Sequence, residues 1–348
     1  MMIMDEPTPS RAISSSQIAR LVRALESLTD GELAVDLLIA AGEQSILPLA
    51  EFLLGGEART IAVPRCRAAQ ALGGLQARGT LLSYFAKVDL PADPVVLFAE
   101  DAVRSAVAHE LLRWREDKVF YAILKAARQR ATVGLIESLG EFCRSDAIPL
   151  LFEILEDDLC RNAAFTALSK TPEESRHYAI LSLRGGAGAN LVGAAASRRR
   201  RATAELFRKL GISRGDWQDV AKFLEDEDPT VIICAATVGF QVAPPEEFQG
   251  IVNALFRVAP KLNWLQEDEV VHLLDQHKSL AYCEANQVLA NLRERGERVN
   301  WLSATWRILE HLGRLDLGRE STMLHKSSCF EVHTSKPPNS FAHGKPAS

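Results

Sequence analysis

The stretch EDDLCRNAAFTALSK, residues 156–170, decides the fold class. Its alanines at 163, 164 and 167 are spaced i, i+1 and i+4, so they form one narrow stripe on a helix. Small side chains in such a stripe let the backbones of neighbouring helices approach closely. A single helix pair cannot bury this stripe, and the stretch therefore predicts that further helix pairs stack against it.

Similar small-residue helices recur along the chain. Four of them end at a leucine, separated by intervals of 39, 28 and 29 residues: Leu72, Leu111, Leu139 and Leu168. The stretch VDLPADPVVL, residues 88–97, accounts for the longer first interval as an insertion. Leucine-rich helices lie between them, with Pro48 and Pro149 in first turns, where proline is tolerated. A period near 29 residues with two helices per unit is typical of an α-solenoid.

The repeat predicts an all-α solenoid over residues 15–312, with an irregular, glycine-rich break at about 184–197. We expect residues 1–14 to be a flexible N-terminus. Residues 313–348 are polar and aperiodic, which predicts a disordered tail. The first helix follows a run of serines, with Gly31 near its end, and one face of it carries the apolar residues Ile18, Leu21, Val22, Leu25 and Leu28.

Four segments combine an acidic turn or a Pro-Arg start with a small-residue helix: PRCRAAQALGGL (64–75), EDAVRSAVAHELL (100–112), EDDLCRNAAFTAL (156–168) and LEDEDPTVIICAATVG (224–239). This pattern resembles HEAT repeats, in particular the short HEAT-like type of phycobilisome-lyase-related proteins. The resemblance implies that certain Asp–Arg pairs lie at the turns between helices and pair along the stack: Asp101 with Arg104, and Asp158 with Arg161. Thr132 and Ile232 stand where the arginine would be, so such a ladder would be interrupted.

Composition and cysteine spacing narrow the class of protein. The net charge of -5 argues against a wholly basic protein that coats nucleic acid. The N-terminus lacks the pattern of a signal peptide, and apolar runs such as VDLLIAAG are too short to span a bilayer, so we predict a cytoplasmic protein without a membrane span. No CxxC pair occurs, and five of the six cysteines lie among helical apolar residues, which favours buried free thiols over disulfides or zinc: Cys66, Cys143, Cys160, Cys234, Cys283 and Cys329.

One basic cluster is a candidate binding patch for phosphates or an acidic partner. Its residues lie in SRRRRATAELFRKLGISR (197–214), against a single acidic residue, Glu205: Arg198, Arg199, Arg200, Arg201, Arg208, Lys209 and Arg214. If the run is helical, four consecutive arginines point to different sides of the axis and cannot all face one groove. A solvated charge run is the competing interpretation.

The usual signatures of catalysis, cofactor binding and metal binding do not emerge from the sequence. The glycines between 185 and 193 lack the Lys and Ser or Thr of a phosphate-binding loop. His272 and His277 would point to different faces of a helix, and HExxH does not occur. The acidic pairs Glu100-Asp101 and Asp157-Asp158 recur at one position of the repeat, which favours turns and helix N-termini. We therefore assign no catalytic, cofactor-binding or metal-binding residues.

The function that these patterns favour is a non-catalytic scaffold or adaptor that binds a protein partner through a curved surface of helical repeats. Two alternatives stay open. A nucleic-acid-binding protein of the HEAT type would use the 198–214 cluster. A HEAT-type lyase or glycosylase would need a pocket that contains a perturbed carboxylate or thiol.

Overall fold

A computed structural model describes residues 13–55, 61–87, 89–184, 194–295 and 304–313 of the chain. Within these residues every regular element is an α-helix or a short 3-10 helix, which confirms the all-α fold class. The chain divides into two compact units, Met1–Ile212 and Ser213–Ser348. The predicted N-terminal segment and tail, and most of the predicted break, lie outside the described residues.

The first unit contains twelve α-helices among its described residues: α1 (Ser15–Ala24), α2 (Gly31–Ala41), α3 (Ile46–Gly55), α4 (Val63–Gly74), α5 (Arg78–Lys87), α6 (Pro94–Leu111), α7 (Asp117–Gln129), α8 (Val133–Phe142), α9 (Ile148–Ile154), α10 (Arg161–Ser169), α11 (Pro172–Arg184) and α12 (Ala194–Leu210). The four predicted small-residue helices correspond to α4, α6, α8 and α10. Pro48 and Pro149 lie in the first turns of α3 and α9, as the repeat predicts.

The second unit carries five labelled α-helices and a further helical stretch at 304–313: α13 (Trp217–Val220), α14 (Pro229–Val242), α15 (Phe248–Val258), α16 (Trp264–Asp275) and α17 (Lys278–Arg295). Helix α14 is its best-buried element and packs against both α15 and α16. It begins after Asp228, whose carboxylate accepts a hydrogen bond from the N–H of Thr230 and so caps the helix.

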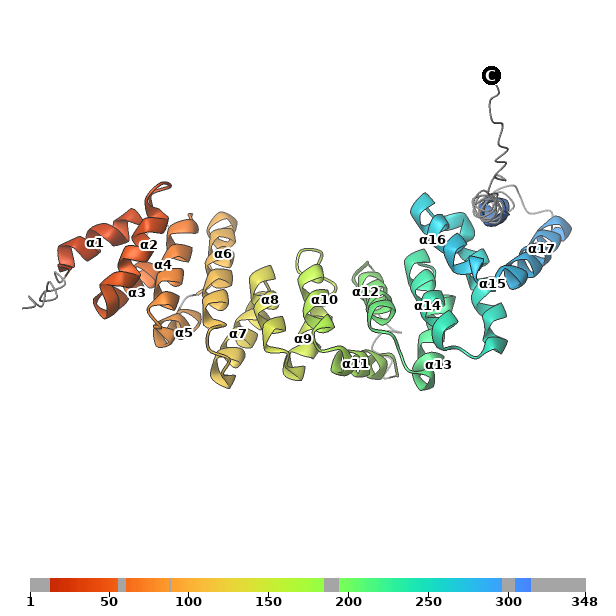
Figure 1. The fold of residues 1–348 in the computed structure, drawn as a ribbon, viewed down its shortest axis with the longest axis horizontal. Helices are drawn as coiled ribbons and strands as arrows, with labels where there is room; N and C mark the ends of the chain where they lie inside the picture. Colours follow the sequence, from red (N-terminus) through yellow and green to blue (C-terminus); the bar gives the residue numbers. More distant parts are fainter. Residues whose placement is uncertain (1–12, 56–60, 88, 185–193, 296–303, 314–348) are drawn as a thin grey trace, which may run out of the picture. The chain divides into compact units, whose positions relative to one another are not determined.

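The helices of the first unit form two layers (Figure 1). In one layer the even-numbered helices lie side by side: α4 packs against α2 and α6, α8 packs against α6 and α10, and α12 packs against α10. In the other layer α5 packs against α3 and α7, and α9 packs against α11. Each helix therefore contacts the second helix along the chain as well as its neighbour, an arrangement that is compatible with an α-solenoid.

The small-residue stripe is buried, as predicted. Ala163, Ala164 and Ala167 are all buried in α10. Gly140 of α8 lies against Ala167 so closely that a side chain at 140 would place its Cβ 2.9 Å from the Cα of Ala167. Larger residues at either position would separate α8 from α10, so small side chains set the spacing of this pair.

The first helix ends earlier than predicted. It stops at Ala24, Gly31 begins α2, and Leu28 lies between them with its side chain 91% exposed. Arg67 of α4 stabilises the turn that follows, because it donates hydrogen bonds to the carbonyl oxygens of Leu25 and Ser27. These bonds satisfy one carbonyl at the C-cap of α1 and one in the turn after it. The guanidinium also fills the space that a side chain at Gly31 would need.

One helical stretch in the described part of the chain, Gly31–Gly55, is long and apolar enough to cross a membrane by length and composition. The sequence predicted that each apolar run is too short to span a bilayer. In the structure, however, two of these runs join through a 3-10 turn, Gly42–Ser45, and form one longer helical stretch. That turn is bent, because Gly42 has a φ of 78°, a conformation that favours glycine. Leu38, Leu49 and Leu53 of this stretch are fully buried in the first unit, whereas Leu33 and Leu47 are exposed and 22% of its most apolar 18-residue window is buried.

A substitution at Gly140 tests the close contact between α8 and α10. We expect Gly140→Ala to lower the free energy of unfolding by about 1–3 kcal/mol, because the new methyl group overlaps Ala167. Gly79→Ala in α5 is the matched control, since a methyl group there meets nothing within 4 Å and should stabilise the helix by up to about 1 kcal/mol. Urea unfolding measures both. Equal stability of the two variants would contradict the assigned packing.

Candidate binding surface

A buried cluster of charged and polar side chains joins α4, α5 and α6. Nη1 of Arg65 lies 2.6 Å from Oε2 of Glu100, and both side chains are almost wholly buried. Nε of Arg65 donates a second hydrogen bond to the carbonyl of Leu53 in α3. The hydroxyl of Tyr84 donates to Glu100. Burial, together with the charge of Glu100, raises the pKa of this hydroxyl and keeps it protonated as a donor.

Arg104 extends this cluster toward α7. Its Nη2 donates to the carbonyl of Ala126 at 2.8 Å, and burial lowers the pKa of its guanidinium. Its Nε has no hydrogen-bond partner among the described residues. Cys66, next to Arg65, has a raised pKa because it is also partly buried. A thiol with a raised pKa is a poor nucleophile at neutral pH. The cluster therefore holds helices together and has no activated nucleophile.

The structure corrects the interpretation of Glu100-Asp101 as an acidic pair in a turn. Both residues lie in the middle of α6, and Glu100 is fully buried. The implied pairing of Asp101 with Arg104 is also wrong. Asp101 instead accepts a two-pronged interaction from Arg130, 29 residues further along the chain, with Nη2 2.6 Å from Oδ2. Arg104 is drawn inward because its guanidinium meets a buried carbonyl.

Other polar contacts repeat this separation along the chain. Lys170 pairs with Glu141, again 29 residues apart, and this hydrogen bond lowers the pKa of Glu141. Arg144 pairs with Asp117 at a separation of 27 residues. The side chains therefore connect successive helix pairs rather than positions within one helix. The sequence spacing of i, i+3 suggested the local pairing because it does not reveal which neighbour is nearer in space.

The second implied pair, Asp158 with Arg161, is wrong for the same reason. Arg161 lies 3.1 Å from Oε2 of Glu205 in α12. Asp158 lies 3.6 Å from Arg198, which also donates to the carbonyl of Glu156. Helix α12 packs against α10 and supplies the partners of both residues.

The structure places most of the basic cluster on α12. Arg198 and Arg199 pair with Asp158 and Glu156, beside the start of α10. Arg200 and Arg201 are half-buried, and both make interactions of their own. Lys209 is exposed, with its ammonium 5.1 Å from the centre of the Phe165 ring. Arg198 and Arg199 thus contact carboxylates of the same unit, so a share of the cluster's charge is compensated there.

The remaining two members of the cluster lie apart from these contacts. Arg208 is exposed near the end of α12 and also makes an interaction of its own. Arg214 is exposed in the 3-10 helix Arg214–Asp216, which belongs to the second unit.

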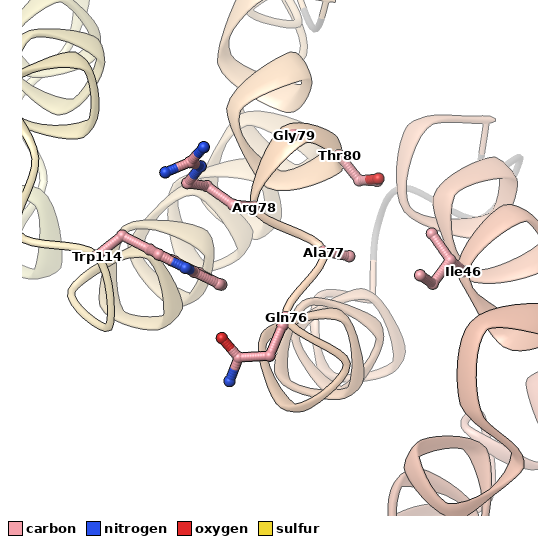
Figure 2. Close-up of a pocket in the computed structure, with 7 residues that line it drawn as sticks. All are labelled: Ile46, Gln76, Ala77, Arg78, Gly79, Thr80 and Trp114. Atoms are coloured by element: carbon pink, nitrogen blue, oxygen red, sulfur yellow. The ribbon is translucent and has the colours of Figure 1, made fainter.

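Two open cavities lie beside α3 and α5 in the first unit. Figure 2 shows the first, of about 480 Å³, in which Thr80 points toward Ile46 while the indole of Trp114 and the guanidinium of Arg78 lie on the opposite side. Its floor includes Gln76, a non-glycine residue with a φ of 59°. The Arg78 guanidinium pairs with Glu116.

The second cavity, of about 550 Å³, shares Thr80 with the first and is mostly apolar on its α3 side. Its described lining residues are Leu47, Ala50, Glu51, Leu54, Gly55, Thr80, Ser83 and Lys87. They include one carboxylate and no thiol, and none of them comes from the buried Arg65–Glu100 cluster.

A group of exposed apolar side chains lies at the N-terminal ends of α4 and α6. Val63 is 49% exposed on α4, while Val95 and Phe98 are 64% and 79% exposed on α6. Ile61, just before α4, is 60% exposed. Val95 and Phe98 are neighbours on α6, and we call these two residues the apolar patch. The sequence did not predict the patch, because residues 88–97 were interpreted as an insertion between two repeats. The sequence feature that could have revealed it is the i, i+3 spacing of Val95 and Phe98, which places both side chains on one face of a helix.

The described cysteines are free thiols, but the prediction that they are buried holds only for Cys160 and Cys234. Cys66 is half-buried, and Cys143 and Cys283 are exposed, because they lie on the solvent side of their helices or helix ends. Among the described residues, no three His, Cys, Asp or Glu side chains gather in a way that could hold a metal ion. His272 is exposed. His277 stacks on Phe240, with ring centres 4.2 Å apart, and burial lowers its pKa.

Comparison with known protein families finds no family model that matches this chain. Comparison with curated proteins likewise finds no match.

Replacing Glu100 tests the buried ion pair. We expect Glu100→Gln to lower the free energy of unfolding by about 3–5 kcal/mol, because it leaves the buried guanidinium of Arg65 without a counter-charge. The triple variant Arg65→Met, Tyr84→Phe, Glu100→Leu should recover most of this loss, since it removes both charges and the hydroxyl that donates to Glu100. Urea unfolding followed by circular dichroism measures both. A single variant that costs less than about 1 kcal/mol would indicate an exposed pair instead.

His277 predicts a pH dependence of stability. The unfolded chain protonates this imidazole near its ordinary pKa of about 6.5, whereas the folded chain requires a lower pH. The unfolded state therefore binds more protons in this window, and the free energy of unfolding falls as pH falls through it, then levels off below the folded-state pKa. Thermal unfolding from about pH 8 to about pH 5 should show this fall in the wild type.

His277→Phe is the matched control, because it keeps a ring against Phe240 and cannot titrate. Its unfolding temperature should fall less than that of the wild type over the same pH range. Parallel curves for the two proteins would show that His277 does not contribute to the pH dependence.

Proposed function

We propose that this protein is a non-catalytic scaffold or adaptor, an α-solenoid of HEAT-like helix pairs that binds a protein partner on its exposed helical surface. The packing of the first unit supports the solenoid. Every even-numbered helix from α4 to α10 lies between its two even-numbered neighbours. Polar contacts that link successive pairs recur at separations of 27 to 29 residues, which is close to the period of the sequence repeat.

The apolar patch is the observation that carries the binding role. Large apolar side chains on a protein surface cost free energy when they stay in water, and a group of them marks an interaction site more often than a scatter of single residues does. Val95 and Phe98 are neighbours on one face of α6. The nearby buried carboxylate Glu100 is occupied by Arg65 and Tyr84, so it supports the fold of this surface.

The experiment is affinity capture of the tagged full chain from the lysate of its native cell, with and without nuclease and at two salt concentrations. We expect protein partners that persist after nuclease treatment and at the higher salt. The variant Arg208→Ser, Lys209→Ser, Arg214→Ser removes three exposed members of the basic cluster. It should retain those partners.

Recovery of nucleic acid that is lost at higher salt and in this variant would overturn the proposal, because phosphate contacts through basic residues weaken steeply with salt. Capture of no macromolecule in any condition would also contradict it.

A further inference from the structure

The second cavity is a groove that runs along α3 and α5. Leu47 and Leu54 line it from α3, and Thr80 and Lys87 line it from α5. In each helix these two residues are seven positions apart, which is two turns or about 10 Å. Ile46 and Thr80, both near helix starts, line the first cavity together, so α3 and α5 start at the same end of the groove.

Small side chains form the outer side of α5. Gly79 and Ala86 are exposed there, and Ser83 between them is half-buried, at positions i, i+4 and i+7 of one helix face. A Cβ built on Gly79 would meet nothing within 4 Å, so the space above this face is open. Because these side chains are small, the backbone of a docked element can approach α5 closely.

Helix α7 is the other neighbour of α5 (Figure 1). Arg78, the first residue of α5, pairs with Glu116 just before α7, so these two helices also start at the same level. Lys118 and Lys125 of α7 are exposed and are again seven positions apart. The two lysines therefore follow α5 over the same two turns as Leu47 and Leu54 on α3.

Lys118 and Lys125 lie on the side of α7 that faces outward and toward α5. Asp117 marks the opposite, α9 side, because it pairs with Arg144 in the turn before α9. At about 100° per residue, both lysines lie roughly 80–100° from Asp117 around the helix axis. In the other direction from Asp117 the next side chain is Leu124, which is buried. The exposed face thus extends from Asp117 toward α5.

The charges around the groove are unequal. Glu51 and Lys87 line it together, and neither has an ion-pair partner among the described residues, so their opposite charges offset each other. Lys118 and Lys125 also lack an ion-pair partner in the described part of the chain, which leaves the α7 side positive. Two exposed carboxylates of the adjoining turns lie beyond the ends of α3 and α5: Glu43 and Asp89.

A ligand that fits this groove has one apolar side and one acidic side. Leu47, which is 67% exposed, and Leu54 offer apolar contacts on α3, while Lys118 and Lys125 attract carboxylates on α7. A helix presents side chains at i and i+7 with the same rise of about 10 Å that separates the residues of each wall. It also brings its own backbone hydrogen bonds, whereas an extended peptide finds no strand edge here with which to pair.

We propose that this groove, from Leu47 and Leu54 across α5 to Lys118 and Lys125, is a docking site for an acidic amphipathic helix of a partner protein. The inference rests on the proposed adaptor function and adds a second surface, in the layer of helices that does not contain the apolar patch. Leucines of the docked helix pack on α3, and its carboxylates pair with the two lysines. A nucleic acid has no apolar side to cover the α3 wall, and the net charge of -5 repels a polyanion.

The test measures binding of two synthetic fluorescent peptides to the full chain by anisotropy. Both carry leucine at i and i+7 on one helix face; on the adjoining face one peptide has glutamate and the other has lysine. We expect the Glu/Leu peptide to bind and the Lys/Leu peptide to bind at least about tenfold more weakly. The variant Lys118→Gln, Lys125→Gln should weaken binding of the Glu/Leu peptide by about tenfold, and Leu47→Gln should weaken it by about fivefold or more.

Two controls separate the groove from general attraction of anions. Lys222→Gln, Lys261→Gln makes the same change of charge at two exposed lysines of the second unit and should leave binding of the Glu/Leu peptide unchanged. A fluorescent single-stranded DNA oligonucleotide tests a phosphate backbone as the ligand and should not bind through Lys118 and Lys125. Circular dichroism should show unchanged helicity in every variant, because the replaced side chains are exposed and glutamine is a good helix former.

Equal binding of the Glu/Leu peptide to the wild type and to the Lys118→Gln, Lys125→Gln variant would overturn the proposal. So would oligonucleotide binding that is lost in this variant. If lysate capture recovers protein partners while the Glu/Leu peptide binds both proteins equally, the docking site is refuted and the adaptor function stands. If lysate capture recovers none while peptide binding depends on Lys118 and Lys125, the docking chemistry stands and the adaptor function is refuted.

Discussion

Close approach of neighbouring helices is the constraint on which the first unit depends. Gly140 against Ala167 sets the spacing of α8 and α10, because any larger side chain would overlap backbone atoms. Gly134 lies against Ser105 in the same way, between α8 and α6. Once the helices are this close, each one buries a face that it could not bury alone. The two layers of helices follow from this repeated requirement.

Buried charge then fixes which residues meet. Arg65, Glu100 and Tyr84 come from three different helices and form hydrogen bonds with one another. Such a cluster contributes little net stability compared with apolar packing, but a misaligned arrangement would leave charges unpaired and is therefore strongly disfavoured. The same pairing aligns α4 with α6.

The basic cluster is partly compensated within the first unit, because Arg198 and Arg199 on α12 contact acidic residues beside α10. The apolar side chains Val95 and Phe98 stay exposed on α6, next to the exposed carboxylate of Asp93 that caps this helix. The basic run is the more conspicuous feature in the sequence, whereas the exposure of Val95 and Phe98 is evident only in the structure.

The helical class, the repeat and the burial of Ala163, Ala164 and Ala167 could be predicted from sequence, because periodicity and residue size are local properties that packing must respect. The ion-pair partners between successive helix pairs could not be predicted, since the sequence does not specify which side chain of the next helix pair lies nearest. Asp101 therefore meets Arg130 rather than Arg104, and Arg161 meets Glu205 rather than Asp158. The apolar patch was likewise decided by tertiary structure, because exposure depends on where neighbouring helices begin and end.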